Sequence, residues 1–390
     1  MLAATVRITR DLDLAEDCTQ DAFARALQSW PENGIPARPG AWLTTVAGNR
    51  ARDLLRRESR WQRALPELII EDAPGPDAVL DPFADDQLRL IFTCCHPALP
   101  REAQIALTLR LVCGLSTAEV ARAFLVREPT MAARITRAKK KIATARIPYK
   151  IPGPDDLPAR IAAVCEVLHL VFTTGHLAPV GDQLLRVDLS EAAIRLSRVL
   201  HGFLPRDREV SSLLALMLLT DSRRDARTTP AGELVLLADQ DRGRWNRDQI
   251  SEGITVITDA LAGAPPTAYG IEAAIAAVHA EAATWQDTDW DEIVGLYDLL
   301  LRVRPSPVIT MNRAIAIGMR DGPAAGLALL DPLLEEPALA TYPYLAAARA
   351  DFLRRLGQSA AAIQAYQEAL AITDNEVERR FLQRRLDQLH

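Results

Sequence analysis

Lysine is scarce in this sequence. Only four of the 45 basic residues are lysines, and all four lie between residues 139 and 150. The window from Arg127 to Lys150 holds eight basic residues against one acid, Glu128. In a chain whose net charge is -6, such a concentrated cluster indicates a polyanionic partner. The alternative is a plain helical hairpin with a solvated basic face, and we favour nucleic acid.

Cysteines are few as well. The five cysteines, at positions 18, 94, 95, 113 and 165, are odd in number and show no C-x-x-C spacing. This pattern does not suit a disulfide framework or a zinc knuckle. The one cluster is Cys94, Cys95 and His96. Adjacent residues on a helix point about 100° apart and chelate poorly, so we favour buried cysteines over a metal or redox site. We predict no metal and no cofactor.

Signals for membranes, secretion and catalysis are also missing. No run approaches the roughly twenty apolar residues of a membrane span. The first residues, MLAATVRITRD, carry charges too early for a signal peptide. We find no P-loop, G-x-S-x-G, H-E-x-x-H or dinucleotide-binding signature, so we do not expect an enzyme. The missing membrane span and signal peptide predict a cytoplasmic protein without a membrane contact. Alanine, leucine and arginine dominate and β-branched runs are few, which predicts an all-α chain.

Residues 100–142 show the pattern of a helix-turn-helix. An apolar stripe predicts a first helix, which Gly114 ends because glycine adopts positive φ at least cost. Ser116 followed by Glu119 is a capping box that begins a short second helix. A tight turn leads to a basic helix that begins near Pro129. In such an arrangement the last helix enters the major groove of DNA.

Two further helices are predicted before this motif. In DLDLAEDCTQDAFARALQSW, apolar residues recur at three- and four-residue steps, and Glu16, Asp17 and Asp21 lie on another face. These acids form either a solvated face or a docking surface for a basic partner. Pro31 ends this helix, and a loop rich in proline and glycine follows.

The next helix, from residue 41 to 63, contains six arginines between or beside Trp42 and Trp61. Aromatic rings interleaved with guanidinium groups suit single-stranded DNA, because the rings stack on unpaired bases while the cations bind phosphates. Trp42 could equally be a core residue. Six arginines on one helix are harder to explain as a solvated face.

Composition and charge change along the chain. Residues 1–150 carry a net charge of +4 and residues 151–390 one of -10. We predict an acidic, proline-rich linker at 64–86 and a second break at 148–158. Residues 159–390 are predicted to form helical hairpins. Within them, the segment 233–250 is interpreted as an ion-pair network beside a tryptophan rather than a ligand contact.

The clearest hairpin repeat lies near the C-terminus. Small Ala362, aromatic Tyr366 and small Ala369 follow Gly357 at the spacing of a tetratricopeptide second helix. Stacked hairpins bury a continuous core and leave a concave face for a partner. The sequence therefore predicts a C-terminal α-helical repeat domain.

The first 145 residues resemble the sigma-70 family of bacterial transcription initiation factors, in its extracytoplasmic-function (ECF) branch. DLDLAEDCTQDAFARAL and AWLTTVAGNRARDLLRRE are similar to region 2, and GLSTAEVARAFLVREPTMAARITRAKKKI is similar to region 4. The resemblance implies region 2 at 1–63, a linker at 64–86 and region 4 at 87–147. After the break at 148–158, residues 159–390 resemble the helical-repeat extension of one subgroup, in which the extension regulates activity through a protein or a ligand.

The resemblance also assigns roles to residues. Docking on the β′ clamp helices of the RNA polymerase core is implied for Asp17, Asp21, Phe23 and Leu27, and region 4 is expected to meet the β flap. Base capture is implied for the loop from Pro31 to Gly40. Contacts with the −10 promoter element are expected from Trp42, Asn49, Arg50, Arg56, Arg57 and Arg60. Contacts with the −35 element are expected from Arg127, Thr130, Met131, Arg134, Arg137, Lys139 and Lys140.

One departure from the family is visible at the start of the chain, which begins almost at the DLDLAED helix. We therefore expect most of the first region 2 helix to be missing and polymerase affinity to be affected.

The alternative function is a stand-alone helix-turn-helix regulator with a sensory helical-repeat domain. It explains residues 100–142 but leaves the arginine-tryptophan helix without a role.

Overall fold

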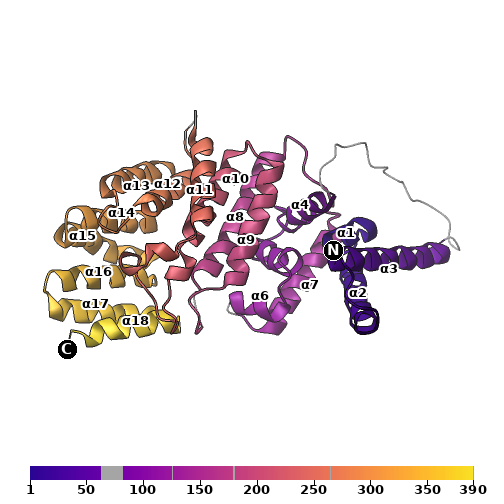
Figure 1. Cartoon of the computed structure of the whole chain (residues 1–390), viewed down its shortest axis with the longest axis horizontal. Coiled ribbons are helices and arrows are strands. Elements are labelled where there is room, and N and C mark those ends of the chain that lie inside the picture. The colour runs from indigo at the N-terminus through magenta and orange to yellow at the C-terminus, as the bar shows by residue number, and fades with distance from the viewer. Residues whose placement is uncertain (63–81, 125, 179–180, 264, 390) are drawn as a thin grey trace. The chain divides into compact units, whose positions relative to one another are not determined.

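The computed structural model describes residues 1–62, 82–124, 126–178, 181–263 and 265–389. These residues divide into two compact units, Met1–Val167 and Leu168–His390. The division falls inside a single helix, α8. Helices run through both units, as Figure 1 shows.

The predicted all-α class is confirmed, because the described residues contain eighteen α-helices and no strand. Only two isolated β-bridges occur in these ranges, Gly181 with Asn375 and Thr228 with Leu234. The first unit comprises α1 (Leu2–Thr9), α2 (Leu12–Asn33), α3 (Pro39–Gln62), α4 (Pro82–Cys94), α5 (Arg101–Leu107), a π-helical turn (Thr108–Val112), α6 (Thr117–Ala123), α7 (Glu128–Thr144) and the start of α8 (Leu157–His176). The second unit comprises α9 (Val187–Phe203), α10 (Arg208–Asp221), α11 (Arg247–Leu261), α12 (Ala268–Glu281), α13 (Trp290–Val303), α14 (Pro307–Arg320), α15 (Pro323–Leu330), α16 (Pro343–Arg355), α17 (Ser359–Ile372) and α18 (Glu376–Asp387).

Short side chains bring the first three helices together. On α2, Ala15, Cys18, Ala22 and Ala26 recur every three or four residues, and all four are buried. Both α1 and α3 pack against α2. A stripe of small residues on one face lets neighbouring helices approach closely, so the core of this part is thin and tight.

The end of α2 differs from the prediction. Pro31 lies inside the helix, which continues to Asn33 and is followed by Gly34 at a φ of 78°. The stop is set by the glycine, because a residue at positive φ ends the helical hydrogen-bond ladder while a proline near the C-terminal end does not. The loop predicted from Pro31 to Gly40 is therefore shortened to residues 34–38.

In the helix-turn-helix, the glycine turn and the capping box are present as predicted. Gly114 has a φ of 78°, and the Ser116 hydroxyl accepts from the backbone N–H of Glu119 at 3.2 Å. The Glu119 carboxylate accepts in return from the backbone N–H of Ser116 at 2.7 Å. The first helix departs from the prediction, because its last part is a π-helical turn rather than a continuation of α5.

Residues in both predicted linkers make contacts within the first unit. Residues 64–81 lie outside the described ranges, but residues 82–86 already belong to α4. Asp86 is buried and lies 3.4 Å from both Arg7 of α1 and Arg89 of α4. Tyr149 is also buried, and its hydroxyl donates to the carbonyls of Ala3 and Asp86 at 2.7 and 2.8 Å. These contacts tie α1 to α4.

The first half of the second unit is built around α10. This helix packs against α9, α11 and α12, and 11 of its 14 residues are buried (Figure 1). A helix that is buried nearly all round belongs to the core, which agrees with the apolar run of its sequence.

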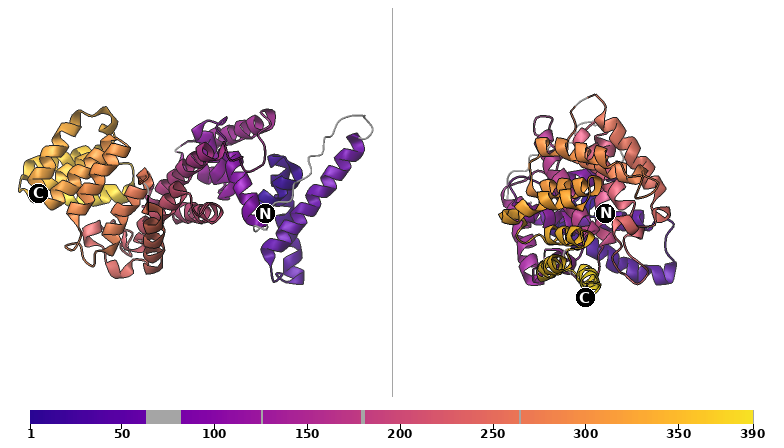
Figure 2. Two further views of the ribbon diagram at one scale, coloured as in Figure 1. Left: turned by 90° about the horizontal axis from the view of Figure 1, so that it is seen from above. Right: turned by 90° about the vertical axis from the view of Figure 1, so that its left-hand side faces the viewer.

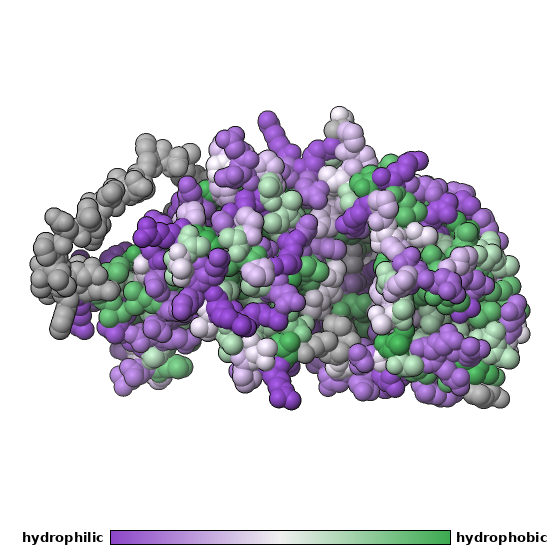
Figure 3. Space-filling model, turned by 180° about the vertical axis from the view of Figure 1, so that it is seen from behind, coloured by the Kyte–Doolittle hydropathy of each residue, from purple (hydrophilic) through white to green (hydrophobic). Residues whose placement is uncertain are grey.

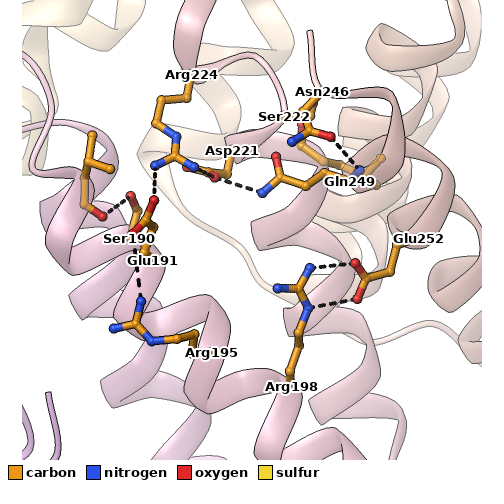
Figure 4. Close-up of polar contacts among 12 residues, drawn as sticks. Ser190, Glu191, Arg195, Arg198, Asp221, Ser222, Arg224, Asn246, Gln249 and Glu252 are labelled. Carbon is orange, nitrogen blue, oxygen red and sulfur yellow. Dashed lines mark hydrogen bonds and ion pairs between the residues drawn. The ribbon is translucent and has the colours of Figure 1, made fainter. Parts of the chain in front are cut away.

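A polar network closes the C-terminal end of α10, as Figure 4 shows. The Asp221 carboxylate is 1% exposed and accepts from Arg224 at 2.9 Å and from Gln249 at 3.1 Å. Arg198 of α9 donates twice to Glu252 of α11, at 2.9 and 2.6 Å. These bonds join α9, α10 and α11.

From α12 onward, consecutive helices pack against one another, and the orange and yellow helices remain stacked in both views of Figure 2. Ala362, Tyr366 and Ala369 are all buried, as the repeat pattern requires. A β-carbon at Gly318 or Gly326 would collide with the ring of Phe352, so these glycines allow α14 and α15 to close around it. The helical hairpins are present, and their assignment as tetratricopeptide repeats stays a prediction.

Within the described ranges, α8 is long and apolar enough to cross a membrane by length and composition alone. A core helix of a soluble protein has the same character, and one such helix is weak evidence. The sequence analysis expected no segment of this kind, so the finding corrects it. Hydrophilic and hydrophobic groups are interspersed over the face seen in Figure 3.

Candidate nucleic-acid interface

The basic helix α7 separates a buried face from an exposed one. Its inner residues recur at helical spacing and are all buried: Met131, Ile135, Ala138 and Ile142. The outer side is therefore left to solvent. It carries Thr130, Arg137, Lys140 and Lys141, with the exposed Arg127 as the N-cap residue.

This outer side carries polar and basic groups of the kinds that contact duplex DNA. Arg127 and Thr130 stand at the start of the helix, where side chains of a recognition helix reach base edges. Arg137 and Lys140 follow two to three turns later, and cations placed there neutralise phosphates. The Nε of Arg137 donates to the carbonyl of Ala133 at 3.2 Å, which steadies the stem of this side chain.

Met131 does not belong to this surface, contrary to the sequence-based assignment. Its side chain is 0% exposed. It lies one turn before Ile135 on the inner face of α7, so it packs in the core of the helix-turn-helix and cannot touch a base.

Arg134 lies at the edge of the surface. Its Nη1 is 2.9 Å from the Glu102 carboxylate of α5, and its guanidinium lies 5.5 Å from the ring centre of Phe124. The two contacts hold α7 against the helices before it. A phosphate or base that binds Arg134 would have to compete with Glu102.

Lys139 points away from the exposed side and meets α2. Its ammonium lies 2.7 Å from Asp13 and also binds Glu16. Burial lowers the pKa of Lys139, but its hydrogen bonds with both acids outweigh burial and raise the pKa above its ordinary value. Glu16 also accepts from Arg110 at 3.0 Å. The sequence placed Lys139 among the DNA contacts, whereas here it joins two helical parts of the first unit.

The second basic helix, α3, exposes some of the side chains that were predicted to contact the −10 element. Asn49, Arg56 and Arg57 are exposed, and Arg60 lies on the helix although its side chain is outside the described ranges. Trp42 is half-buried, and its ring centre lies 5.6 Å from that of Trp30 at an angle of 60°. The sequence left open whether Trp42 lies in the core or on the surface. In the structure it lies between the two and forms an aromatic pair with Trp30 at the start of α3.

Arg50 is engaged within the protein. Its Nε lies 2.8 Å from the Asp21 carboxylate of α2. One residue predicted to contact DNA therefore pairs with one predicted to contact polymerase. Both side chains remain partly exposed, 29% and 49%, so the pair is a surface bond that a partner can displace.

An exposed apolar patch follows on α2. Phe23 is 44% exposed and Leu27 is 79% exposed, one turn apart, and the exposed Asp17 lies before them. Ile35, in the loop after α2, is 71% exposed and was missed by the sequence analysis. Its isolated position between prolines gave no periodic signal. Exposed side chains of this size with a neighbouring acid suit a protein partner.

The two cysteines of the Cys94, Cys95 and His96 cluster lie in the core. Cys94 and Cys95 are buried, and burial raises the pKa of Cys94 well above its ordinary value and that of Cys95 to about 11. Protonated thiols are poor ligands and poor nucleophiles. Across the described ranges, no group of three or more His, Cys, Asp or Glu side chains is placed to hold a metal ion.

Models of three protein families match separate segments of the chain. Residues 2–61 match sigma-70 region 2, and residues 89–142 match sigma-70, region 4. Residues 160–261 match a family of unknown function, DUF6596.

Two relatives extend this comparison. The chain is 43% identical over 394 residues to an uncharacterized protein of Rhizobium meliloti, with 100% of this chain and 93% of the relative covered. It is 30% identical over 132 residues to the ECF RNA polymerase sigma factor SigE of Mycolicibacterium smegmatis, which covers 33% of this chain and 50% of that protein.

A helix-turn-helix beside a second basic helical domain defines an all-α transcription factor. Region 2 and region 4 of one such group are matched in order along the chain. The chain belongs to the sigma-70 family of transcription initiation factors, in its extracytoplasmic-function branch.

Proposed function

We propose that the protein binds the RNA polymerase core and directs it to specific promoters, where α7 reads the −35 element and α3 reads and helps to melt the −10 element. The observation that carries this proposal is the presence of two basic helices with different chemistry in one unit. The first has the placement of a major-groove reader, and the second combines arginines with an aromatic pair. A regulator that binds duplex DNA alone needs only the first.

At the −35 element, Arg127 and Thr130 are proposed to contact bases, and Arg137 and Lys140 to bind phosphates. Each phosphate contact displaces counterions, so binding weakens as salt rises. Arg134 is proposed to reach DNA only when its bond with Glu102 opens.

At the −10 element, Trp42 and Trp30 offer aromatic faces beside the exposed Asn49, Arg56 and Arg57. Unpaired bases stack on such faces with a gain of about 1–3 kcal/mol per base, which offsets the cost of opening the duplex. We propose that the loop at 34–38 holds a flipped base next to this pair.

Polymerase docking is proposed for the exposed side of α2. Phe23 and Leu27 supply apolar contact, and Asp17 and Asp21 supply charge for a basic partner on the β′ clamp helices. Asp21 becomes available when its bond with Arg50 is exchanged for a bond to the partner. Region 4 is proposed to meet the β flap.

The contact between α7 and α2 belongs to the free protein in this proposal. The −35 and −10 elements lie more than one helical turn apart, and one turn alone spans about 34 Å along the DNA. Two readers joined by Lys139, Asp13 and Glu16 cannot span that distance. We therefore propose that engagement with polymerase separates region 2 from region 4.

The second unit is proposed to regulate this activity in the cytoplasm, through a regulatory protein or a ligand, without a membrane partner. Its high negative charge makes it unsuited to DNA, and its paired helices offer surface for a partner. No catalytic step is assigned to the protein.

Transcription in vitro tests the proposal. Purified protein with polymerase core should yield a defined transcript start from a cognate promoter, and should co-purify with core. The protein without core should not protect that promoter from nuclease. Tight, specific duplex binding by the free protein would favour the stand-alone regulator instead.

A further inference from the structure

The second unit contains a cavity of about 410 Å³ that is bordered by α8, α10, α12, α13 and α14. Much of its wall is aliphatic and comes from Leu216, Ile275, Leu300, Val308 and Ile309. This volume lies within the range of small-molecule sites, which are mostly apolar with a few polar groups that fix the orientation of the ligand.

One helix supplies a row of rings to this wall. His169, Phe172 and His176 all line the cavity from α8, and their spacing of three and four residues places them on one face of the helix. The rings of Phe172 and His176 are nearly parallel, with centres 5.6 Å apart and an angle of 14° between their planes. Tyr297 of α13 adds a fourth ring. Flat rings favour a flat aromatic ligand, because stacking adds to the apolar contact.

The charges of the wall cancel. Among the described residues that line the cavity, only Glu272 and Arg304 carry a full charge at pH 7, and they form an ion pair with each other. Burial, and then the charge of nearby arginines, lowers the pKa of His169 to about 4 and that of His176 well below its ordinary value, so both imidazoles are neutral. A charged ligand would meet no unpaired counter-charge on this wall, and an ionised group left unpaired away from water is costly. The wall therefore suits an uncharged ligand.

Polar side chains of the wall are left without partners. Tyr297 of α13 and Asn312 of α14 line the cavity, and no hydrogen bond of either side chain to a described residue is found. Burial is the main cause that raises the pKa of Tyr297 to about 12, so its hydroxyl stays protonated and can donate. A hydroxyl group on a ligand both donates and accepts, which matches a tyrosine hydroxyl and a carboxamide equally well.

We propose that this cavity binds a small, uncharged aromatic molecule that carries a hydroxyl group. Its ring lies against Phe172 and His176, and its hydroxyl is bound by Tyr297 and Asn312. The inference names a ligand class for the regulatory role proposed above and rests on that role only for its use in the cell. Binding is a property of the free protein, so a failed transcription assay would bear on the promoter function and not on this site.

The experiment is equilibrium dialysis of the full chain at pH 7 against three probes with one ring system: 2-naphthol, naphthalene and naphthalene-2-carboxylate. 2-Naphthol should bind about fivefold more tightly than naphthalene, because naphthalene leaves the polar groups of the wall unpaired. It should bind at least about tenfold more tightly than the carboxylate, which must leave water without a counter-charge. Equal or tighter binding of the carboxylate, or no binding of 2-naphthol at millimolar concentration, would overturn the proposal.

Tyr297→Phe tests the polar contact, because it removes one hydroxyl and keeps the ring. The affinity for 2-naphthol should fall about fivefold, to that of naphthalene, and naphthalene binding should stay the same. Tyr342→Phe removes a hydroxyl from a half-buried tyrosine of the same unit that does not line the cavity, and it should change neither affinity. Unchanged 2-naphthol binding in Tyr297→Phe would contradict the assignment.

A second variant tests the cavity itself. Thr173 is half-buried and lines the wall from α8, so Thr173→Phe fills part of the space and should weaken 2-naphthol and naphthalene alike. Circular dichroism checks that the variant keeps its helical content. Wild-type affinity for both probes in the folded variant would place their binding elsewhere and overturn the proposal.

Discussion

The ammonium of Lys139 on α7 lies 2.7 Å from the carboxylate of Asp13 on α2. The same helix turns Arg137 and Lys140 to the solvent. One helix therefore carries two sets of cations, an inner one that is paired within the protein and an outer one that is available to DNA.

We expect Lys139→Ala to loosen the contact between α7 and α2. Glu16, 18% exposed, would keep only Arg110 as its cation, and the loss of a hydrogen bond between charged groups costs about 1.5–3 kcal/mol. Hydrogen exchange should become faster over the first turns of α2 and the second half of α7. Lys140→Ala removes an exposed lysine from the same helix and should leave both segments unchanged. Identical exchange in the two variants would show that the inner pair does not hold the helices together.

The double variant Arg137→Ala with Lys140→Ala should weaken promoter binding by the holoenzyme without loss of core binding. If both groups bind phosphates, the slope of log K against log salt should become shallower by about 2. Filter binding or anisotropy over a salt series measures this slope. Met131→Ala serves as the contrast, since its buried side chain should cost stability, about 2–5 kcal/mol, and leave the salt slope as it is. An unchanged slope in the double variant would remove both residues from the interface.

Phe23→Ala and Leu27→Ala should each reduce the affinity for polymerase core by about tenfold, because a well-packed apolar anchor at an interface contributes about 1–2 kcal/mol. Both side chains are exposed in the free protein, so its unfolding should shift little. Pull-down titration with core measures the effect. Leu329, 40% exposed in the second unit, provides the matched control as Leu329→Ala. Equal core affinity in all three variants would place the docking surface elsewhere.

Acid should destabilise the second unit through His169. Burial, and then the charge of Arg304, lowers the pKa of this residue to about 4, below the ordinary value of 6.5. Above pH 6.5 both the folded and the unfolded states are neutral at this position. As the pH falls toward 4, the unfolded state takes up a proton that the folded state does not, so the free energy of unfolding falls.

Because the side chain is only half-buried, we expect a loss on the order of 2 kcal/mol across this window. Chemical denaturation at pH 7 and pH 5 measures it in the wild type and in His169→Phe, which keeps a ring beside Tyr269. The variant should show the smaller decrease. An equal decrease in both proteins would assign the acid sensitivity to other groups.

Local chemistry made much of the fold predictable. The capping box at Ser116 and Glu119, and the turn at Gly114, depend on residues that are adjacent in sequence. Those positions could be found without knowing what packs around them. The apolar spacing of α2 likewise predicted a helix and its buried face.

Contacts between distant segments were not predictable in the same way. Lys139 looked like its neighbours Lys140 and Lys141, and only the packing of α7 against α2 separates them. Met131 was assigned by family position, although its spacing to Ile135 already indicated the inner face. The cavity lined by α8, α10, α12, α13 and α14 is built from helices that are spread over more than 150 residues of the chain, so no local pattern could indicate it.

The clustering of lysines has a practical consequence for labelling. Reagents that acylate side-chain amines can react at only four positions in this chain, and all of them lie in or just after the recognition helix. Lys140, Lys141 and Lys150 are exposed, whereas Lys139 is held protonated by two acids and is therefore a poor nucleophile. Lys139 should therefore be acylated more slowly than the other lysines in the free protein. An increase of its acylation rate when polymerase binds would report that region 2 and region 4 have separated, without an engineered labelling site.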